Sequence, residues 1–197
     1  MNVIVVVAEN PLECDVSDIS DHAVINLQST DFELFQLPLK ATMDLGQLSN
    51  RWKELQALTH PDRFASLGES AVRVAMQYSI RINEAYKRLK SPLSRFAYLC
   101  ELHHCPIDAE SNTSMPLEFL SQQMQWREDL EEAQTSSDIE SLQLEVDELK
   151  ERLQLSCLNA IDIRADFTDA AKIVRSMMFV DKFQQDIDKK SDVLERI

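Results

Sequence analysis

The tripeptide His60-Pro61-Asp62 holds the side chains of this sequence best placed for a directed polar interaction. A proline fixes one of its own backbone dihedrals and pushes the residue before it out of the helical region. The imidazole of His60 and the carboxylate of Asp62 are therefore held in a defined, exposed arrangement. An exposed, rigid and polar loop is typical of a contact surface, so we expect it to bind a partner. No nucleophile–base pair, paired catalytic carboxylates or glycine-rich loop accompanies it, so we expect no enzymatic activity.

A second stretch places four possible metal ligands within six residues: Cys100, His103, His104 and Cys105. Thiols and imidazoles are ligands that zinc and iron prefer, so a metal-binding redox protein is one hypothesis. Ligands this closely spaced rarely give tetrahedral geometry by themselves, and no second cysteine pair lies nearby. We therefore expect no metal and no other cofactor, and this hypothesis ranks below those that follow.

Two amphipathic helices are predicted on either side of the tripeptide. Apolar residues recur at three- and four-residue spacing before it (Leu45, Leu48, Trp52, Leu55) and after it (Ala75, Ile82, Ala85, Leu89). Asp44 is a suitable N-cap for a helix over 45–59, and Pro92 is a stop signal for a second helix over 69–90. Two such helices joined by a short polar loop form an antiparallel hairpin that presents the loop at one end.

The composition favours an all-α protein. Gly46 and Gly68 are the only glycines among the 197 residues. Rossmann and P-loop phosphate sites need several glycines close together, and tight β-hairpin turns also prefer glycine. The scarcity of glycine therefore argues against Rossmann and P-loop sites and against hairpin-rich β structure. The abundance of helix-forming residues favours an all-α protein.

The charge distribution limits the possible partners. The net charge is −14, and residues 103–197 hold twenty-one acidic residues against ten basic ones. Such a chain is a poor nucleic-acid ligand, because phosphate contacts need a basic stripe. The sequence has no convincing secretory signal, transit peptide or membrane span, and its four cysteines do not form a secreted disulfide pattern. We expect a protein of the reducing cytoplasm with no membrane partner.

The second half of the chain is predicted to form an antiparallel three-helix bundle. Helical spacing of apolar residues covers about 116–133, 137–162 and 168–194, with short connections between these segments. Ser137 and Glu140 form a possible capping pair at the start of the middle helix. The expected organisation is therefore an extension without order, a helical hairpin domain, a linker and the bundle, over 1–30, 31–102, 103–115 and 116–197.

Motifs around the tripeptide resemble the J domain of DnaJ-type co-chaperones. They are Leu58-Thr59-His60-Pro61-Asp62-Arg63-Phe64, Ile82-Asn83-Glu84-Ala85-Tyr86 and Leu89-Lys90-Ser91-Pro92-Leu93-Ser94-Arg95. The following Phe96-Ala97-Tyr98-Leu99 and the acidic helical tail are similar to the HscB family, the J-type co-chaperones of iron–sulfur cluster assembly. The resemblance extends from about Asp31 to the C-terminus, and it implies a J domain followed by a scaffold-binding bundle.

The resemblance also implies a chaperone-binding site. In J domains the His-Pro-Asp loop engages a DnaK-type chaperone and triggers its ATP hydrolysis, and nearby basic residues meet acidic surface on that chaperone. The matching residues here are His60, Pro61 and Asp62, with Arg51, Lys53 and Arg63 as candidate steering charges. For each basic residue alone, a solvated helix face is the alternative.

A second site is implied on the bundle. HscB proteins dock the scaffold protein IscU through one face of the first bundle helix and an aromatic residue on the last. The matching positions are Leu120, Ser121, Met124, Gln125, Glu128, Glu132 and Phe179. Ser121 stands where an apolar residue is common, and Gln125 where a carboxylate is common. The alternative is that Leu120 and Met124 belong to the bundle core, although Phe119, Trp126 and Leu130 on the same helix could serve as core instead.

The resemblance thus implies a monomeric co-chaperone that promotes the maturation of iron–sulfur proteins. It would deliver an IscU-like scaffold to a specialised, HscA-like DnaK-type chaperone and stimulate the ATPase of that chaperone. The main alternative is a general J-type holdase whose acidic bundle binds unfolded clients directly.

Overall fold

The computed structural model describes residues 28–107 and 117–194. The predictions for residues 1–27 and for most of the expected linker therefore lie outside the described residues. Every regular element in the described ranges is a helix, which confirms the all-α class. The described residues form two compact units, one containing Met43–Ser91 with the residues up to Leu39, and the other containing Lys40–Thr42 with the residues from Pro92 onward.

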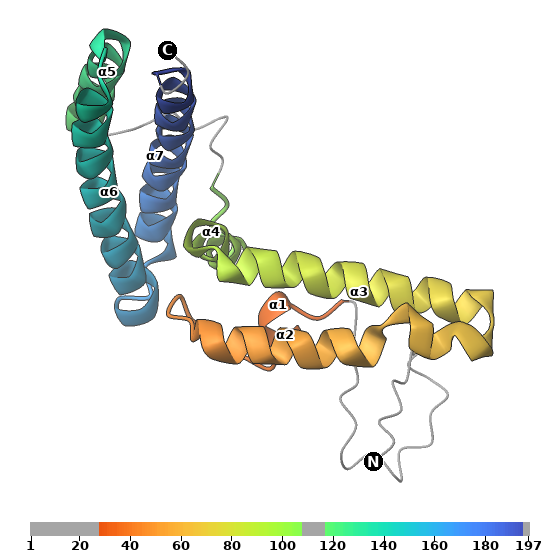
Figure 1. The fold of residues 1–197 in the computed structure, drawn as a ribbon. Helices are drawn as coiled ribbons and strands as arrows, with labels where there is room; N and C mark the ends of the chain where they lie inside the picture. Colours follow the sequence, from red (N-terminus) through yellow and green to blue (C-terminus); the bar gives the residue numbers. More distant parts are fainter. Residues whose placement is uncertain (1–27, 108–116, 195–197) are drawn as a thin grey trace. The chain divides into compact units, whose positions relative to one another are not determined.

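Unit 1 is built on an antiparallel helix pair (Figure 1). Its elements are the short helix α1 (Asp31–Leu34), α2 (Leu45–Thr59), the 3-10 helix η2 (Pro61–Leu67) and α3 (Glu69–Lys90). The bounds predicted for α2 are confirmed, and the Asp44 carboxylate caps it by accepting from the amides of Gly46 and Gln47. The segment after His60, predicted as a loop, is instead a 3-10 helix. Pro61 starts that helix, and the Arg63 N–H donates to the His60 carbonyl at 3.1 Å.

An amide on α3 explains why the Asn83–Tyr86 motif accompanies the hairpin. The Asn83 Oδ1 accepts from Trp52 Nε1 at 2.9 Å and from Gln56 Nε2 at 3.0 Å, both on α2. One turn along, Tyr86 stacks on Trp52 with ring centroids 4.9 Å apart. These contacts join α2 to α3 at a fixed register, because a shift along either helix would break both of them.

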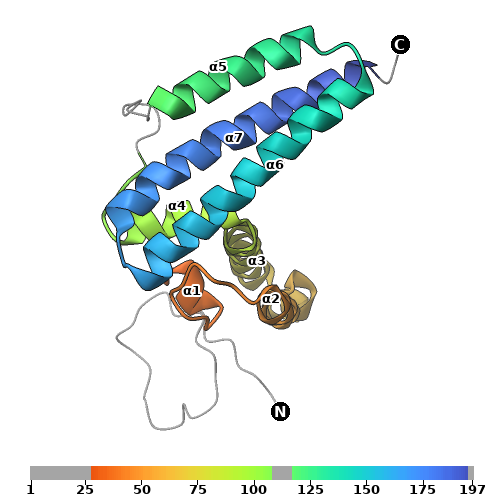
Figure 2. The ribbon, with the colours of Figure 1, turned by 90° about the vertical axis from the view of Figure 1, so that its left-hand side faces the viewer.

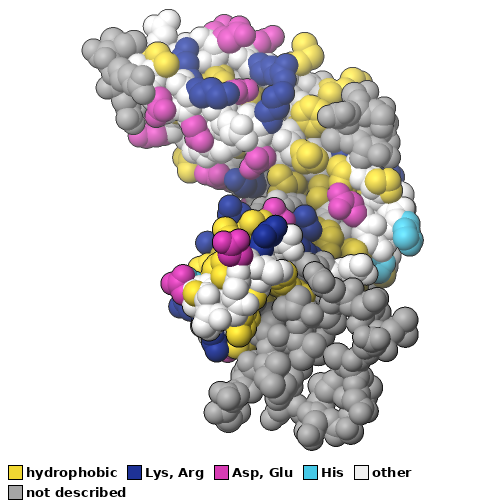
Figure 3. All heavy atoms as spheres, turned by 90° about the vertical axis from the view of Figure 1, so that its right-hand side faces the viewer, with side chains coloured by type: hydrophobic (Ala, Val, Ile, Leu, Met, Phe, Trp, Pro, Cys, Tyr) yellow, Lys and Arg dark blue, Asp and Glu magenta, His cyan; other side chains and the backbone are white. Residues whose placement is uncertain are grey.

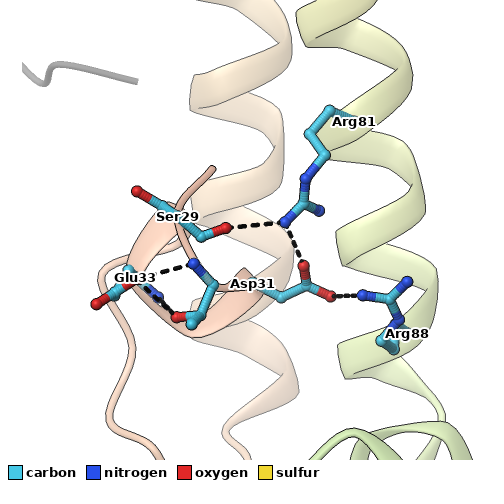
Figure 4. Close-up of polar contacts among 6 residues, drawn as sticks. Ser29, Asp31, Glu33, Arg81 and Arg88 are labelled. Atoms are coloured by element: carbon cyan, nitrogen blue, oxygen red, sulfur yellow. Dashed lines mark hydrogen bonds and ion pairs between the residues drawn. The ribbon is translucent and has the colours of Figure 1, made fainter. Parts of the chain in front are cut away.

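A buried carboxylate attaches α1 to α3 (Figure 4). Asp31 is fully buried and forms ion pairs with Arg81 at 2.6 Å and Arg88 at 2.9 Å. The start of α1 is closed by a capping box in which Thr30 and Glu33 each bond the backbone N–H of the other. Phe32 and Phe35, almost fully buried, complete the attachment.

Unit 2 contains the predicted antiparallel three-helix bundle, formed by α5 (Leu117–Glu132), α6 (Ser136–Leu158) and α7 (Phe167–Leu194) (Figure 2). It also includes α4 (Pro92–Leu102), which packs against α7. The expected end of the hairpin domain at residue 102 thus differs from the boundary between the compact units, which follows Ser91. The buried side chains of α4, Phe96, Leu99 and Cys100, explain why this helix needs a packing partner.

The bundle core lies where the three helices meet. Its fully buried members include Trp126 of α5, Val146 of α6 and Val180 of α7. The predicted capping pair at the start of α6 was wrong by two positions, because Thr135 and Asp138 form the capping box. Thr135 has the extended backbone that an N-cap needs, whereas Ser137 is already helical.

A carboxylate at the end of α6 holds residues 40–42 in unit 2. A π-helical turn, η3 (Asn159–Ile163), follows α6 and contains Asp162. The Asp162 carboxylate accepts from the Ala41 amide at 2.7 Å, from the Thr42 amide at 2.8 Å and from Thr42 Oγ1 at 2.7 Å. Arg95, nearly buried, donates to the Ala41 carbonyl at 2.8 Å. Burial by itself would raise the pKa of Asp162, but these hydrogen bonds outweigh it and lower the pKa.

Candidate functional site

The His60-Pro61-Asp62 turn is exposed and internally bonded. His60 ends α2 with an extended backbone (φ −61°, ψ 126°), as expected for a residue before proline. Its Nδ1 accepts from the Asp62 amide at 3.3 Å and lies 3.5 Å from the Asp62 carboxylate. The His60 and Asp62 side chains are both exposed. The turn therefore presents an oriented imidazole and carboxylate at the point where α2 gives way to η2.

The three candidate steering charges differ in their surroundings. The Arg63 guanidinium donates to the Ala57 carbonyl at 2.9 Å, in the last turn of α2, and so holds the start of η2 against that helix. Arg51 is half-buried and pairs with Glu54 at 2.8 Å. Lys53 is exposed. Arg51 and Lys53 do not share a face of α2, because residues two apart on a helix point in different directions.

Helix α5 has two apolar faces with opposite environments. Trp126 is 2% exposed, stacks on Phe183 with centroids 5.5 Å apart and donates from Nε1 to Glu145 at 3.1 Å. Phe119 and Leu130 are partly buried against the same core. Leu120 and Met124, by contrast, are 40% and 66% exposed. The alternative that Leu120 and Met124 form bundle core is therefore wrong, and these two side chains lie on the solvent face of α5.

The polar residues predicted beside them share this solvent face. Ser121, Gln125, Glu128 and Glu132 are all exposed, and the Gln125 amide donates to Asp129 at 2.9 Å. Phe179 of α7 is half-buried and lines a depression between α5 and α7 together with Gln123 and Arg127. Gln123 follows Leu120 by three positions, and Arg127 follows Met124 by three, so Phe179 borders the same exposed stripe. We call Leu120, Met124 and Phe179 with these four polar residues the α5 surface.

The Cys100–Cys105 stretch packs into unit 2. Cys100 is buried with its thiol 3.9 Å from the Phe167 carbonyl, and His103 stacks on the Phe167 ring at 3.6 Å. Burial raises the pKa of Cys100 to about 11. Within residues 28–107 and 117–194, no group of three or more His, Cys, Asp or Glu side chains is arranged to hold a metal ion.

Two of the polar contacts that shape unit 1 and unit 2 were not anticipated. Asp31 meets its arginines across 50 or more positions, and Asp162 meets Ala41 across 121 positions. A single sequence carries no local signal for either pairing, because an acidic residue near a helix end is ordinarily a solvated one.

None of the helices in the described ranges is both long enough and apolar enough to span a membrane.

Comparison with known proteins identifies close relatives over most of the chain. Residues 115–188 match the family model for the HSCB C-terminal oligomerisation domain. The chain is 38% identical over 174 residues to a co-chaperone protein HscB homolog of Burkholderia thailandensis, covering 87% of this chain and 99% of the relative. It is 37% identical over 172 residues to the homolog of Paraburkholderia xenovorans, covering 86% of this chain and 98% of that relative.

Two solved structures share the fold. The chaperone HscB from Vibrio cholerae superposes with a TM-score of 0.73 at 28% identity, covering 84% of this chain and 99% of that one. The crystal structure of the human co-chaperone protein HscB superposes with a TM-score of 0.81 at 25% identity, covering 92% of this chain and 93% of that one. Both similarities extend over unit 1 and unit 2 alike, as coverage of this size requires.

Proposed function

This chain belongs to the HscB family of co-chaperones, and on that basis we propose that it delivers an IscU-like iron–sulfur scaffold to an HscA-like, DnaK-type chaperone. In this proposal His60, Pro61 and Asp62 engage the chaperone and stimulate its ATPase. The α5 surface binds the scaffold. The protein itself carries out no chemical step, and promotes the maturation of iron–sulfur proteins by bringing its two partners together.

The observation that carries the proposal is the exposure of Leu120 and Met124 on α5. A helix of a small bundle normally turns its large apolar side chains inward, and α5 already does so with Trp126. A second apolar stripe left in solvent on the same helix costs solubility unless it serves a partner. Glu128 and Glu132, exposed on this face, supply a polar rim of the kind that surrounds the apolar centre of an interface.

The exposed His60–Asp62 turn supports the chaperone half of the proposal. Its internal hydrogen bond and the fixed proline reduce the entropy lost when a partner binds, so a small contact can still be specific. Of the candidate steering charges, Lys53 and Arg63 are both exposed, and Lys53 is placed for long-range attraction of a partner. Arg63 is better suited to holding the turn in place, because its guanidinium is bonded to the Ala57 carbonyl.

The test is a steady-state ATPase assay with a purified HscA-like chaperone and an IscU-like scaffold. We expect Asp62→Asn to abolish stimulation while far-UV circular dichroism stays unchanged, because Asp62 is exposed and supports no core contact. We expect Leu120→Ala with Phe179→Ala to weaken scaffold binding by on the order of tenfold or more, since buried apolar anchors contribute most of an interface.

Two outcomes would count against these assignments. Stimulation retained by a folded Asp62→Asn variant would remove the trigger role from the turn. Unchanged scaffold affinity in the Leu120/Phe179 double variant would favour the alternative, a general J-type holdase that binds unfolded clients through its acidic bundle.

A further inference from the structure

A small depression lies beside Phe179 between α5 and α7. Its volume is about 50 Å³, and its apolar lining is formed by Trp126, Phe179, Val180 and Phe183. One water molecule needs roughly 10–15 Å³ on the same measure, so the depression has room for a small aliphatic group. Its rim carries Arg127 from α5 and Lys182 from α7.

The charge of this rim is opposite to that of the surrounding chain. Residues 103–197 hold twenty-one acidic residues and ten basic ones, yet Arg127 and Lys182 are both exposed at the rim. The acidic residue of the lining, Asp186, accepts from Lys189 at 2.8 Å and is thereby engaged by a third cation. Figure 3 shows lysine and arginine side chains gathered together on one area of unit 2, so the acidity of the bundle is not uniform over its surface.

The depression is continuous with the α5 surface. Phe179 belongs to both, and Arg127 lies one turn along α5 from Met124. A partner segment that covers Leu120 and Met124 would therefore reach the depression without leaving α5. The acidic residues on the opposite edge, Glu128 and Glu132, would attract basic groups, so the two edges of the surface select partner charges of opposite sign.

We propose that the α5–α7 depression is a subsite for the scaffold partner, and that it receives a small aliphatic side chain with a carboxylate beside it. The aliphatic group lies on Phe179 and Phe183, and the carboxylate lies between Arg127 and Lys182. This inference rests on the proposed function, since it names the chemistry by which the scaffold meets one edge of the α5 surface. It assigns to Arg127 and Lys182 a role in orientation and in selection of the scaffold.

A purely structural role for the two cations has a different signature. Both lie close enough to Asp186 to lower the pKa of that carboxyl, although the hydrogen bond from Lys189 contributes most. If they served only to hold α5 on α7, their removal would lower the stability of the bundle. Their removal would then leave the salt dependence of scaffold binding unchanged.

The experiment measures the affinity of the full-length chain for an IscU-like scaffold at about 50 mM and about 300 mM salt, between which surface electrostatics are strongly screened. The variants are Arg127→Gln, Lys182→Gln and the pair together. The control is Arg152→Gln, which removes the same charge from an exposed position on α6. We expect the pair to raise Kd about tenfold at low salt, to flatten the salt dependence and to leave thermal unfolding unchanged. We expect the control to change neither affinity nor salt dependence.

A second measurement identifies the carboxylate on the scaffold. Each exposed Asp or Glu of the scaffold is neutralised in turn and tested against wild type and Arg127→Gln. One neutralised position should lose all further sensitivity to Arg127→Gln, because a double-mutant cycle isolates a direct pair. Absence of any coupled position would overturn the subsite.

The proposed function and the subsite fail in different ways. If wild type does not bind the scaffold, or if Leu120→Ala leaves binding intact, the proposed function fails and the subsite with it. If wild type binds and Leu120→Ala weakens it, but the Arg127/Lys182 pair matches Arg152→Gln at both salt concentrations, only the subsite is refuted. A fall in stability with unchanged salt dependence would refute it in favour of a structural role.

Discussion

Truncation of Trp126 should strongly destabilise the bundle, and truncation of Met124 should leave its stability almost unchanged, although these residues lie two positions apart on α5. Trp126 is 2% exposed, stacks on Phe183 and donates to Glu145. Replacement of a buried tryptophan by alanine costs about 3–5 kcal/mol, through lost burial and the cavity that remains. Met124 is 66% exposed, and a surface truncation of this kind changes the free energy of unfolding by less than about 0.5 kcal/mol.

Urea unfolding followed by circular dichroism measures the difference. With an m-value of about 2 kcal/mol per molar urea, Trp126→Ala should lower the midpoint of the bundle transition by roughly 2 M. The chain has two tryptophans, and the other one, Trp52, belongs to unit 1. Fluorescence of the Trp126→Ala variant therefore reports unit 1 alone, and we expect that transition to stay where it is in wild type.

The comparison refutes the assigned faces of α5 if Met124→Ala destabilises the bundle as much as Trp126→Ala does. An unchanged midpoint in Trp126→Ala would also refute the assigned faces of α5. Either result would mean that the helix is rotated about its axis, and that Leu120 and Met124 belong to the core. Scaffold binding by Met124→Ala gives a second check, since this variant should lose affinity while keeping full stability.

Three further predictions concern buried polar groups and thiols. Asp31→Asn should destabilise unit 1 by about 2–3 kcal/mol, seen in Trp52 fluorescence, because two arginines lose their carboxylate. This cost is below that of a fully buried pair, since the side chains of Arg81 and Arg88 are 22% and 43% exposed. An unchanged unfolding midpoint would contradict the prediction. Asp162→Asn should cost about 1–3 kcal/mol at pH 7, since the carboxylate has a lowered pKa when folded and contributes stability above its ordinary pKa of 3.8. That contribution is lost as the pH falls below 3.8 through the folded pKa, so the difference between variant and wild type should vanish in acid, and a difference independent of pH would refute this origin. Burial raises the pKa of Cys157 to about 12 and that of Cys100 to about 11. Peptide mapping after alkylation at pH 8 should therefore find both thiols unmodified in the folded protein, whereas the half-buried Cys105 reacts. Rapid modification of Cys157 would contradict its burial.

Local sequence patterns predicted the helices closely where a clear start or stop signal was present. Helix α2 has the predicted bounds because Asp44 caps its start and Pro61 keeps the preceding residue His60, the C-cap, in an extended conformation. The start of α6 was misplaced because several serine, threonine and acidic residues lie together there, and more than one pair fits the capping spacing. Backbone geometry, with Thr135 extended, selected between them.

Local sequence patterns could not predict which helix α4 packs against or which residues Asp162 contacts. The apolar spacing of α4 shows that one face must be buried but not which helix covers it, and that partner is α7. Asp162 is directed at Ala41 and Thr42 by the π-helical turn that ends α6. Contacts over such sequence separations depend on how whole helices pack, which no window of the sequence contains.

By itself the sequence determined an all-α protein with a rigid His60-Pro61-Asp62 turn between two helices, because proline geometry and helical periodicity are local properties. Its resemblance to the HscB family also predicted a second surface on α5 together with Phe179 of α7, and α5 has two apolar stripes. Which stripe faces solvent was decided only by the tertiary structure. Trp126 is large enough to span the core, stack on Phe183 and reach Glu145, and this placement turns Leu120 and Met124 outward into solvent.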